Sequence, residues 1–548
     1  MSEFYQKFCK ETFDEAGNLT RFDPVVPPDF NFAYDVVDEI ARQEPDRRAM
    51  LWTNVEGAER TYTFADMKRY SDQAAAVMRA HGVGKGDPVM LVMGRHVQFW
   101  FAILACHKLG AVAIPGTHLL TKKDFVYRFQ AASVKAIICL PEGGTAEQAA
   151  LACPECPTVT ARFILGGPRE GWVDFDGEME TVEPLNERLP NSADDPMLMY
   201  FTSGTTGYPK MVLHSFAYPI GHIITAKYWQ CVVPDGLHLT VADTGWGKAV
   251  WGKLYGQWFM RAGVFVYDFD KFEPDKLLAV LEKYRITTFC APPTIYRFFI
   301  KAGMENYDLS SLQYATIAGE ALNPEVFQQF KKLTGLSMME GFGQTETTLT
   351  VFNIKGMTPK PGSMGKPSPM FDVSIIDEDG NPAAPGQTGE IVLRKRPNQC
   401  GLFTEYYRDP EKTEAVWAGG VYHTGDTAWM DEEGYFWYVG RTDDLIKSSG
   451  YRIGPFEIES VLMEHPAVLE CAVTGVPDPV RGQLVKATIV LAKGYEPSEE
   501  LKKDIQSYVK KNTAPYKYPR VVDFVSELPK TISGKIRRTA IRGEEKKA

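Results

Sequence analysis

Short apolar runs alternate with longer amphipathic stretches through most of the chain. Pro88–Met93, Val112–Pro115 and Ala136–Leu140 are continuous apolar runs of strand length. Residues 64–81 and 122–131 instead repeat apolar positions at helical spacing. Strands that alternate with helices predict parallel sheets with crossover helices, because parallel neighbours need a long connection. The pattern therefore predicts an α/β protein whose ligands bind at the carboxyl ends of the strands.

The pattern changes near residue 442, where aromatic-rich α/β sequence gives way to a shorter, more charged region. This region predicts two helices and three strands: a helix at 455–464, strands at 468–473 and 484–491, a helix at 499–511 and a strand at 520–525. We expect an N-terminal domain over residues 1–442 and a small α+β domain over 443–548. A unit of this size is suited to act as a mobile lid.

A polar loop follows the apolar run at residues 196–201. It reads Tyr200-Phe-Thr-Ser-Gly-Thr-Thr-Gly-Tyr-Pro-Lys210. Small residues let the backbone turn tightly and direct its N–H groups inward, and the hydroxyls and one ammonium group add further donors. The loop predicts a phosphate cradle made by Thr202, Ser203, Gly204, Thr205, Thr206, Gly207 and Lys210. It is not a Walker loop, which has Ser or Thr directly after the lysine; the alternative is an ordinary polar surface loop.

A second candidate stretch is Glu340-Gly-Phe-Gly-Gln-Thr-Glu-Thr347. An aromatic side chain between glycines can lie against a purine, and Glu346 is a hard oxygen ligand suited to Mg²⁺. The nucleotide-binding candidates here are Glu340, Gly341, Phe342, Gly343, Gln344 and Thr345. An earlier predicted strand, at residues 314–320, ends in Gly319, Glu320 and Ala321, which we expect at the same site.

Two further groups of residues are candidates for substrate contacts. Asp426 can accept both hydroxyls of a ribose, and Arg441 can join it, although either residue alone would also suit a structural ion pair. Trp246 lies between two glycines in a predicted loop, which favours a substrate-pocket wall over a packing role. Lys248 can face the same pocket. The aromatics that follow, Trp251, Trp258 and Phe259, are instead expected in a core helix.

The chain ends in a basic segment, Leu528-Pro-Lys-Thr-Ile-Ser-Gly-Lys535-Ile-Arg-Arg538. Basic tails are usually solvated, and we expect this of Lys530, Arg537 and Arg538. Lys535 differs, because a Ser-Gly-Lys turn can direct its ammonium group outward.

Composition limits the classes of function. The 548 residues are too many for one core, and the net charge of −10 argues against a nucleic-acid or anionic-membrane surface. No membrane span and no secretory signal are visible, so we expect a cytoplasmic protein. The nine cysteines are expected to be free thiols, and Cys153-Pro-Glu-Cys156 is a chance pair rather than a zinc site.

These motifs resemble, in order and over nearly the whole chain, those of the adenylate-forming enzymes. The chain is most similar to AMP-forming acyl-CoA synthetases of the medium-chain and branched-chain group, through Asp243-Thr-Gly-Trp246, Gly450-Tyr-Arg-Ile-Gly-Pro455 and Pro477-Asp-Pro-Val-Arg481. The resemblance implies a large N-terminal domain of parallel sheets with a small β-barrel-like subdomain, and a mobile C-terminal domain. It implies ATP, Mg²⁺ and coenzyme A as the ligands of the reaction.

The resemblance also implies roles for single residues. Lys535, Lys210 and Glu346 would be catalytic, with Glu346 as the metal ligand, and Asp443 would be the hinge for domain rotation. The expected coenzyme A contacts are Gly450, Tyr451, Arg452 and Arg481. Acetylation of Lys535 by a lysine acetyltransferase would delete its charge and block adenylation.

The acyl substrate is expected to be larger than acetate. Acetate-specific relatives have a tryptophan where this chain has Gly343, so we expect a pocket open to a short or medium linear, branched or aromatic acid. The alternatives are transfer to a carrier-protein phosphopantetheine, a luciferase-like oxygenase, or a nucleotide-binding regulator without catalysis. Monomer and homodimer both remain open.

Overall fold

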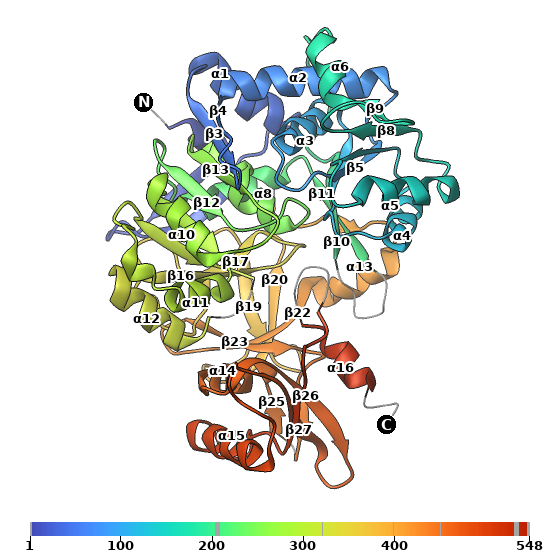
Figure 1. Ribbon diagram of the computed structural model, residues 1–548. Helices are drawn as coiled ribbons and strands as arrows, with labels where there is room; N and C mark the ends of the chain where they lie inside the picture. Colours follow the sequence, from blue (N-terminus) through green and yellow to red (C-terminus); the bar gives the residue numbers. More distant parts are fainter. Residues whose placement is uncertain are drawn as a thin grey trace.

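The computed structural model describes residues 3–202, 209–319, 322–397, 399–449, 451–530 and 536–544. Two large sheets, a small antiparallel sheet and a separate C-terminal sheet make up the fold (Figure 1). A short N-terminal hairpin precedes them, formed by β1 (Cys9–Phe13) and β2 (Leu19–Pro24). Among the described residues, no helix combines the length and the apolar character needed to cross a membrane.

The first large sheet has eight strands in the order β21-β11-β10-β6-β5-β7-β8-β9. Its strands are β5 (Pro88–Val92), β6 (Val112–Pro115), β7 (Ala136–Cys139), β8 (Ala161–Ile164), β9 (Val173–Asp174), β10 (Pro196–Thr202), β11 (Lys210–Ser215) and β21 (Glu405–Tyr406). Its helices are α2 (Phe64–Ala80), α3 (Gln98–Leu109), α4 (Lys122–Ala132), α5 (Thr145–Ala152) and α6 (Phe175–Thr181). The strands from β6 to β9 pair in parallel, as predicted.

The pairing of β10 with β11 departs from the prediction of parallel strands. These two strands are antiparallel, and β11 pairs with β21 in the same way. The physical reason is the connection between β10 and β11, which spans only residues 203–209 and is too short for a crossover helix. The hairpin brings Lys210 directly opposite Thr202.

The second large sheet has nine strands in the order β18-β17-β16-β15-β14-β12-β13-β3-β4. Its strands are β3 (Arg48–Asn54), β4 (Glu59–Thr63), β12 (Leu237–Thr240), β13 (Gly263–Asp268), β14 (Thr288–Ala291), β15 (Tyr314–Ile317), β16 (Met338–Gly343), β17 (Leu349–Phe352) and β18 (Lys366–Pro367). Its flanking helices are α10 (Pro274–Lys283), α11 (Pro293–Lys301) and α12 (Pro324–Thr334).

Four short helices contribute side chains to the main hydrophobic core: α1 (Glu39–Gln43), α7 (His222–Ile224), α8 (Gly247–Lys253) and α9 (Tyr255–Phe259). This core buries Trp251, Trp258 and Phe259 to 8% exposure or less. The sequence prediction of a core role for these three aromatics is confirmed.

The small antiparallel sheet corresponds to the predicted β subdomain. It contains β19 (Asp372–Ile376), β20 (Gly389–Arg394), β22 (Val421–Met430) and β23 (Phe436–Arg441), and α13 (Pro410–Val416) precedes β22. This sheet lies between the large sheets and the C-terminal sheet (Figure 1).

The C-terminal region has its own sheet and its own core. Its strands are β24 (Ile446–Ser448), β25 (Tyr451–Ile453), β26 (Val468–Asp478), β27 (Gly482–Leu491) and β28 (Val521–Phe524), with helices α14 (Pro455–Glu464), α15 (Glu499–Asn512) and α16 (Arg538–Glu544). The side chain of Ser498 caps α15 by accepting a hydrogen bond from the backbone of Leu501. The domain boundary at residues 442 and 443 stays a prediction, which the separate core supports.

Candidate active site

The hairpin of β10 and β11 forms one wall of the site. Its turn end is the start of the predicted phosphate cradle, where Thr202 faces Lys210. The hydroxyl of Thr202 is buried and has no hydrogen-bond partner among the described residues, so a phosphate oxygen could satisfy it. Five predicted cradle residues lie outside the described residues: Ser203, Gly204, Thr205, Thr206 and Gly207.

Lys210, Glu346 and Tyr406 form a compact charged cluster at the turn end of this hairpin. The Lys210 ammonium donates to Glu346 Oε1 at 2.6 Å and to the Tyr406 hydroxyl at 2.8 Å. That hydroxyl in turn donates to the same Glu346 oxygen at 2.8 Å. Burial opposes ionisation of Glu346, but the Lys210 charge and these hydrogen bonds outweigh it, and the pKa of the carboxyl is lowered. Glu346 is therefore an ionised oxygen donor.

An ionised carboxylate at this place fits a magnesium ion. Mg²⁺ prefers oxygen ligands and commonly takes only one or two carboxylates, with substrate phosphates and water completing its shell. The part of the chain that the structure describes contains no group of three or more His, Cys, Asp or Glu side chains suited to a metal. The role of Glu346 as a magnesium ligand stays a prediction, with which its ionised state is compatible.

The strand β16 supplies the second wall and ends in the Gly-Phe-Gly stretch. Added Cβ atoms would lie 2.8 Å from the indole of Trp229 at Gly341 and 2.5 Å from the backbone oxygen of Thr348 at Gly343. Contacts under 3.0 Å force a neighbour to move, so both positions require glycine for close approach of the backbone. Phe342, held between them, is partly exposed and free to meet a flat ring.

The backbone just before Glu346 is fixed by a buried histidine. His214 Nε2 donates to the carbonyl of Thr345 at 2.8 Å. Burial lowers the pKa of His214 to about 4, so the imidazole is neutral at physiological pH. A neutral donor holds the strand end without adding charge next to Glu346.

Gln344 connects the second wall to the small antiparallel sheet. Its Oε1 accepts a hydrogen bond from the Tyr422 hydroxyl at 2.7 Å. Its Nε2 donates to the carbonyl of Thr424 at 2.8 Å and to Asp426 Oδ2 at 2.5 Å. The stretch at residues 340–347 and the predicted ribose acceptor Asp426, far apart in the chain, are therefore in direct contact.

Asp426 and Arg441 face each other across β22 and β23. Arg441 Nη1 lies 3.6 Å from Asp426 Oδ2, and its Nε lies 3.6 Å from Asp443 Oδ1. The Tyr438 hydroxyl donates to the other Asp426 oxygen at 3.0 Å. The predicted ribose acceptor and the predicted hinge thus share one guanidinium group.

An aromatic side chain lies beside Gly343, the residue predicted at the acyl pocket. A Cβ atom on Gly343 would lie 2.7 Å from Cη2 of Trp251, whose indole N–H donates to the Tyr218 hydroxyl at 3.0 Å. An anchored indole from α8 is therefore a neighbour of Gly343, and the open acyl pocket stays a prediction. Trp246 lies just before α8 and is partly exposed.

Lys248 binds the chain just after β15, next to the predicted nucleotide-binding residues 319–321. Its ammonium donates to the carbonyl of Ala318 at 2.7 Å. Gly319 follows with φ of +102°, a conformation that glycine adopts without strain. The next two predicted residues, Glu320 and Ala321, lie outside the described residues, as do Gly450 and Lys535.

Three of the predicted coenzyme A contacts are on the surface of the C-terminal region. Tyr451 is 50% exposed. Arg452 pairs with Glu378 of the small antiparallel sheet, and Arg481 Nη1 donates to Ser449 Oγ at 3.2 Å. Arg452 and Arg481 are both exposed, and guanidinium groups are suited to phosphate binding.

Sequence reasoning missed Tyr406, Tyr438 and the unusual state of Glu340. The two tyrosines lie in β21 and β23, and only the contacts of their hydroxyls with residues distant in sequence or on the neighbouring strand give them a role. Glu340 was expected near the nucleotide, but its carboxyl is 4% exposed, and burial raises its pKa to about 8. Its apolar flanks in β16 are the one sequence signal for that burial.

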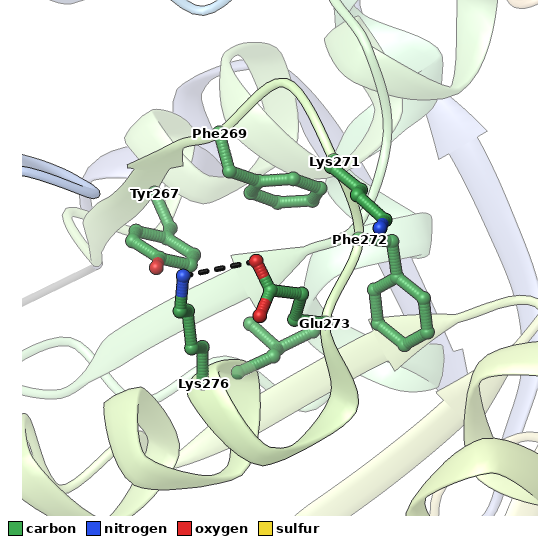
Figure 2. Close-up of a pocket in the computed structure, with 7 residues that line it drawn as sticks. Tyr267, Phe269, Lys271, Phe272, Glu273 and Lys276 are labelled. Carbon is green, nitrogen blue, oxygen red and sulfur yellow. Dashed lines mark hydrogen bonds and ion pairs between the residues drawn. The ribbon is translucent and has the colours of Figure 1, made fainter.

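A hollow elsewhere on the surface is not a competing site. It lies at the end of β13 and the start of α10, where the Lys276–Glu273 pair at 2.9 Å crosses it (Figure 2). It leaves no volume for even a water molecule.

The fold and this arrangement define the class of protein. A lysine beside an ionised carboxylate, with the Asp426–Arg441 pair nearby, is an arrangement suited to a nucleotide. A model for the AMP-binding enzyme family matches residues 37–407, and one for the AMP-binding enzyme C-terminal domain matches residues 457–535. The chain belongs to this family.

Relatives make the class more specific. The chain is 42% identical to the human mitochondrial acyl-coenzyme A synthetase ACSM3, over 95% of this chain and 90% of that protein. It is 43% identical to human mitochondrial ACSM4, over 99% and 95%. The chain is thus an ATP-dependent, AMP-forming acyl-CoA synthetase, and the prediction from its motifs is confirmed.

Solved structures confirm the fold. The anthranilate CoA ligase AuaEII bound to anthranoyl-AMP is 28% identical, with a TM-score of 0.86 over 95% of this chain and 98% of that one. A benzoate CoA ligase from Burkholderia xenovorans is 26% identical, with a TM-score of 0.81 over 94% and 100%.

Proposed function

We propose that this acyl-CoA synthetase activates a carboxylic acid larger than acetate and transfers the acyl group to free coenzyme A. The observation that carries the proposal is the Lys210–Glu346–Tyr406 cluster beside the Gln344–Asp426 contact. A cation and an ionised oxygen there would meet the phosphates of ATP, and Asp426 next to them would accept the ribose hydroxyls.

In the first half-reaction, a carboxylate oxygen of the acid attacks the α-phosphorus of ATP. The P–O bond to pyrophosphate breaks, and an acyl-adenylate forms. Both reactants are anions, so the barrier is largely electrostatic and fixed positive groups lower it. Lys210 and Lys535 supply such charges, and the Thr202 hydroxyl supplies a donor.

Each ligand has residues that would hold it. Magnesium bound at Glu346 would neutralise phosphate charge as pyrophosphate leaves. Asp426 would accept the ribose hydroxyls, with Tyr438 and Gln344 fixing the orientation of its carboxylate. Phe342 would lie against the adenine.

In the second half-reaction, the thiol of coenzyme A attacks the acyl carbon of the adenylate. The bond to the AMP oxygen breaks, and AMP leaves as the thioester forms. The C-terminal domain rotates about Asp443 to exchange Lys535 for the thiol entrance at Gly450. Arg441, which binds both Asp426 and Asp443, links the nucleotide site to that pivot.

The acid is short to medium in length, branched or aromatic. Relatives named acyl-coenzyme A synthetases and ligases for anthranilate and benzoate support this range. Trp251 beside Gly343 offers an aromatic surface on which an apolar chain or a ring can pack.

A panel of acids tests the proposal. AMP and pyrophosphate release is measured with ATP, Mg²⁺ and acids from acetate to decanoate, together with isobutyrate, 2-methylbutyrate and benzoate, each with and without coenzyme A. We expect coenzyme A-dependent turnover that is highest for an acid above acetate. Highest turnover with acetate would contradict the substrate class, and adenylation without coenzyme A turnover would favour a carrier-protein acceptor.

Two further proposals concern the cell. We place the enzyme in the cytoplasm, although the similar relatives are named mitochondrial, and fractionation of source cells tests this. We also propose acetylation of Lys535 as an off-switch. A mass spectrum of protein from its native source that shows Lys535 always unmodified would contradict it.

A further inference from the structure

Arg538 is not the solvated tail residue that the sequence predicts. It begins α16, which packs against β26 in the C-terminal region (Figure 1). Its guanidinium binds Glu459 of α14 through two nitrogens, with Nε at 3.2 Å from Oε1 and Nη2 at 2.7 Å from Oε2. Paired donors of this geometry fix the orientation of the arginine as well as its position.

A second carboxylate holds the same helix from the hinge side. Asp444 Oδ2 lies 3.6 Å from Arg538 Nη1, and Asp444 Oδ1 accepts from Arg542 Nη1 at 2.6 Å. Only 12% of the side chain of Asp444, and 12% of that of Glu459, is exposed. Asp444 directly follows the proposed pivot Asp443, so α16 is clamped to the start of the rotating unit.

The chain just before Arg538 is also held. Lys530 and Ile536 form an antiparallel bridge, and the backbone N–H of Arg537 donates to the carbonyl of Pro529 at 2.8 Å. Lys535 precedes Arg538 by three residues, which span at most about 10–11 Å of chain. Whatever fixes Arg538 therefore limits the region that the Lys535 ammonium can reach.

Arg538 also lies near the nucleotide end of the N-terminal domain. Burial and the Asp426 charge raise the pKa of Tyr438 well above its ordinary value, and the charge of Arg538 acts in the opposite direction. Tyr438 donates to Asp426, the proposed ribose acceptor. The clamp thus directs the end of the C-terminal domain toward that part of the site.

We propose that Arg538 is a positioning residue of the adenylation half-reaction, which acts through Lys535. Clamped by Glu459 and Asp444, it anchors the chain three residues after Lys535, and so limits where that lysine can act in adenylation. This inference rests on the proposed function. It assigns Arg538 no contact with substrate and no part in the transfer to coenzyme A.

The test compares Arg538→Gln with Arg537→Gln. Arg537 is exposed, and its side chain has no partner among the described residues, so it is a matched neighbouring control. Adenylation is followed by acid-dependent ATP–pyrophosphate exchange, and transfer by thioester formation from added acyl-adenylate and coenzyme A. Thermal unfolding of each full-length variant reports on folding, and Arg538→Lys and Glu459→Gln repeat the test with milder changes.

We expect Arg538→Gln to slow exchange at least tenfold and to change transfer less than twofold, with Arg538→Lys in between. Arg537→Gln leaves both rates within twofold of wild type. In a Lys535→Ala background, Arg538→Gln adds less than a twofold loss, because the residue through which it acts is gone.

Equal losses in both half-reactions, or a full additional loss in the Lys535→Ala background, would overturn the inference in favour of a general structural role. Unchanged exchange in folded Arg538→Gln would also overturn it. If wild type itself shows no acid-dependent exchange, the proposed function fails, and that outcome is distinct from these.

Discussion

Replacing Lys210 by methionine tests the charged cluster most sharply. The change keeps the length of the side chain but removes the ammonium 2.6 Å from Glu346, whose side chain is only 8% exposed. Removing one partner of a buried pair costs about 3–5 kcal/mol of stability when the other charge stays buried. Lys210 is 22% exposed, so we expect the lower end of that range.

The catalytic loss follows from the same geometry. A fixed donor directed at developing charge contributes about 2.7–4 kcal/mol, or roughly 10²–10³ in rate. We therefore expect Lys210→Met to slow acid-dependent ATP–pyrophosphate exchange roughly 10²–10³-fold. Without Lys210, burial raises the pKa of Glu346, so the acid limb of the residual activity moves to higher pH.

Tyr406→Phe is the matched control, because it keeps the ion pair and removes only the hydroxyl. That hydroxyl makes two contacts of 2.8 Å, and a hydrogen bond to a charged group contributes about 1.5–3 kcal/mol. We expect a loss of roughly tenfold in exchange. The reasoning is wrong if Lys210→Met retains exchange near the wild-type rate, or if Tyr406→Phe is as damaging as Lys210→Met.

Three further changes have defined outcomes. Gly343→Ala places a methyl group 2.7 Å from Trp251, so the free energy of unfolding falls by about 1–3 kcal/mol. We also expect KM to rise more for longer acids than for short ones. An equal change of KM for all acids would count against Gly343 and Trp251 as a wall of the acyl pocket. Asp426→Asn weakens the charged hydrogen bonds to the ribose and raises KM for ATP roughly tenfold to a hundredfold, while kcat changes less. An unchanged KM for ATP would show that Asp426 does not bind the ribose. Burial raises the pKa of Glu340 from 4.5 to about 8, so between these pH values the folded chain holds a proton that the unfolded chain releases, and the stability of the fold falls as the pH rises. Glu340→Gln removes this titration and flattens that part of a plot of Tm against pH. An unchanged slope in the variant would refute the assignment.

Local patterning predicted most elements. The helix at Pro455–Glu464 and the strand at Val112–Pro115 have the predicted bounds, because proline, glycine and apolar periodicity mark their ends. The antiparallel return of β11 was missed, although the length of its connection requires it.

Parts of the site depend on contacts that no local pattern encodes. Trp251 was correctly predicted in the core, yet only the tertiary fold brings its ring to Gly343, which is distant in sequence. Arg538 looked like one more cation in a basic tail. Its role depends on Glu459, which is distant in sequence and meets it only because α14 and α16 pack on the same sheet.

The most direct test of the central claim follows an oxygen atom. The acid that turns over fastest in the panel is supplied with ¹⁸O in both carboxylate oxygens, together with ATP, Mg²⁺ and coenzyme A, and the products are analysed by mass spectrometry. Attack of the carboxylate on the α-phosphorus predicts one ¹⁸O in AMP and one in the acyl-CoA. Unlabelled AMP, or label in inorganic phosphate with ADP as the nucleotide product, would contradict the acyl-adenylate.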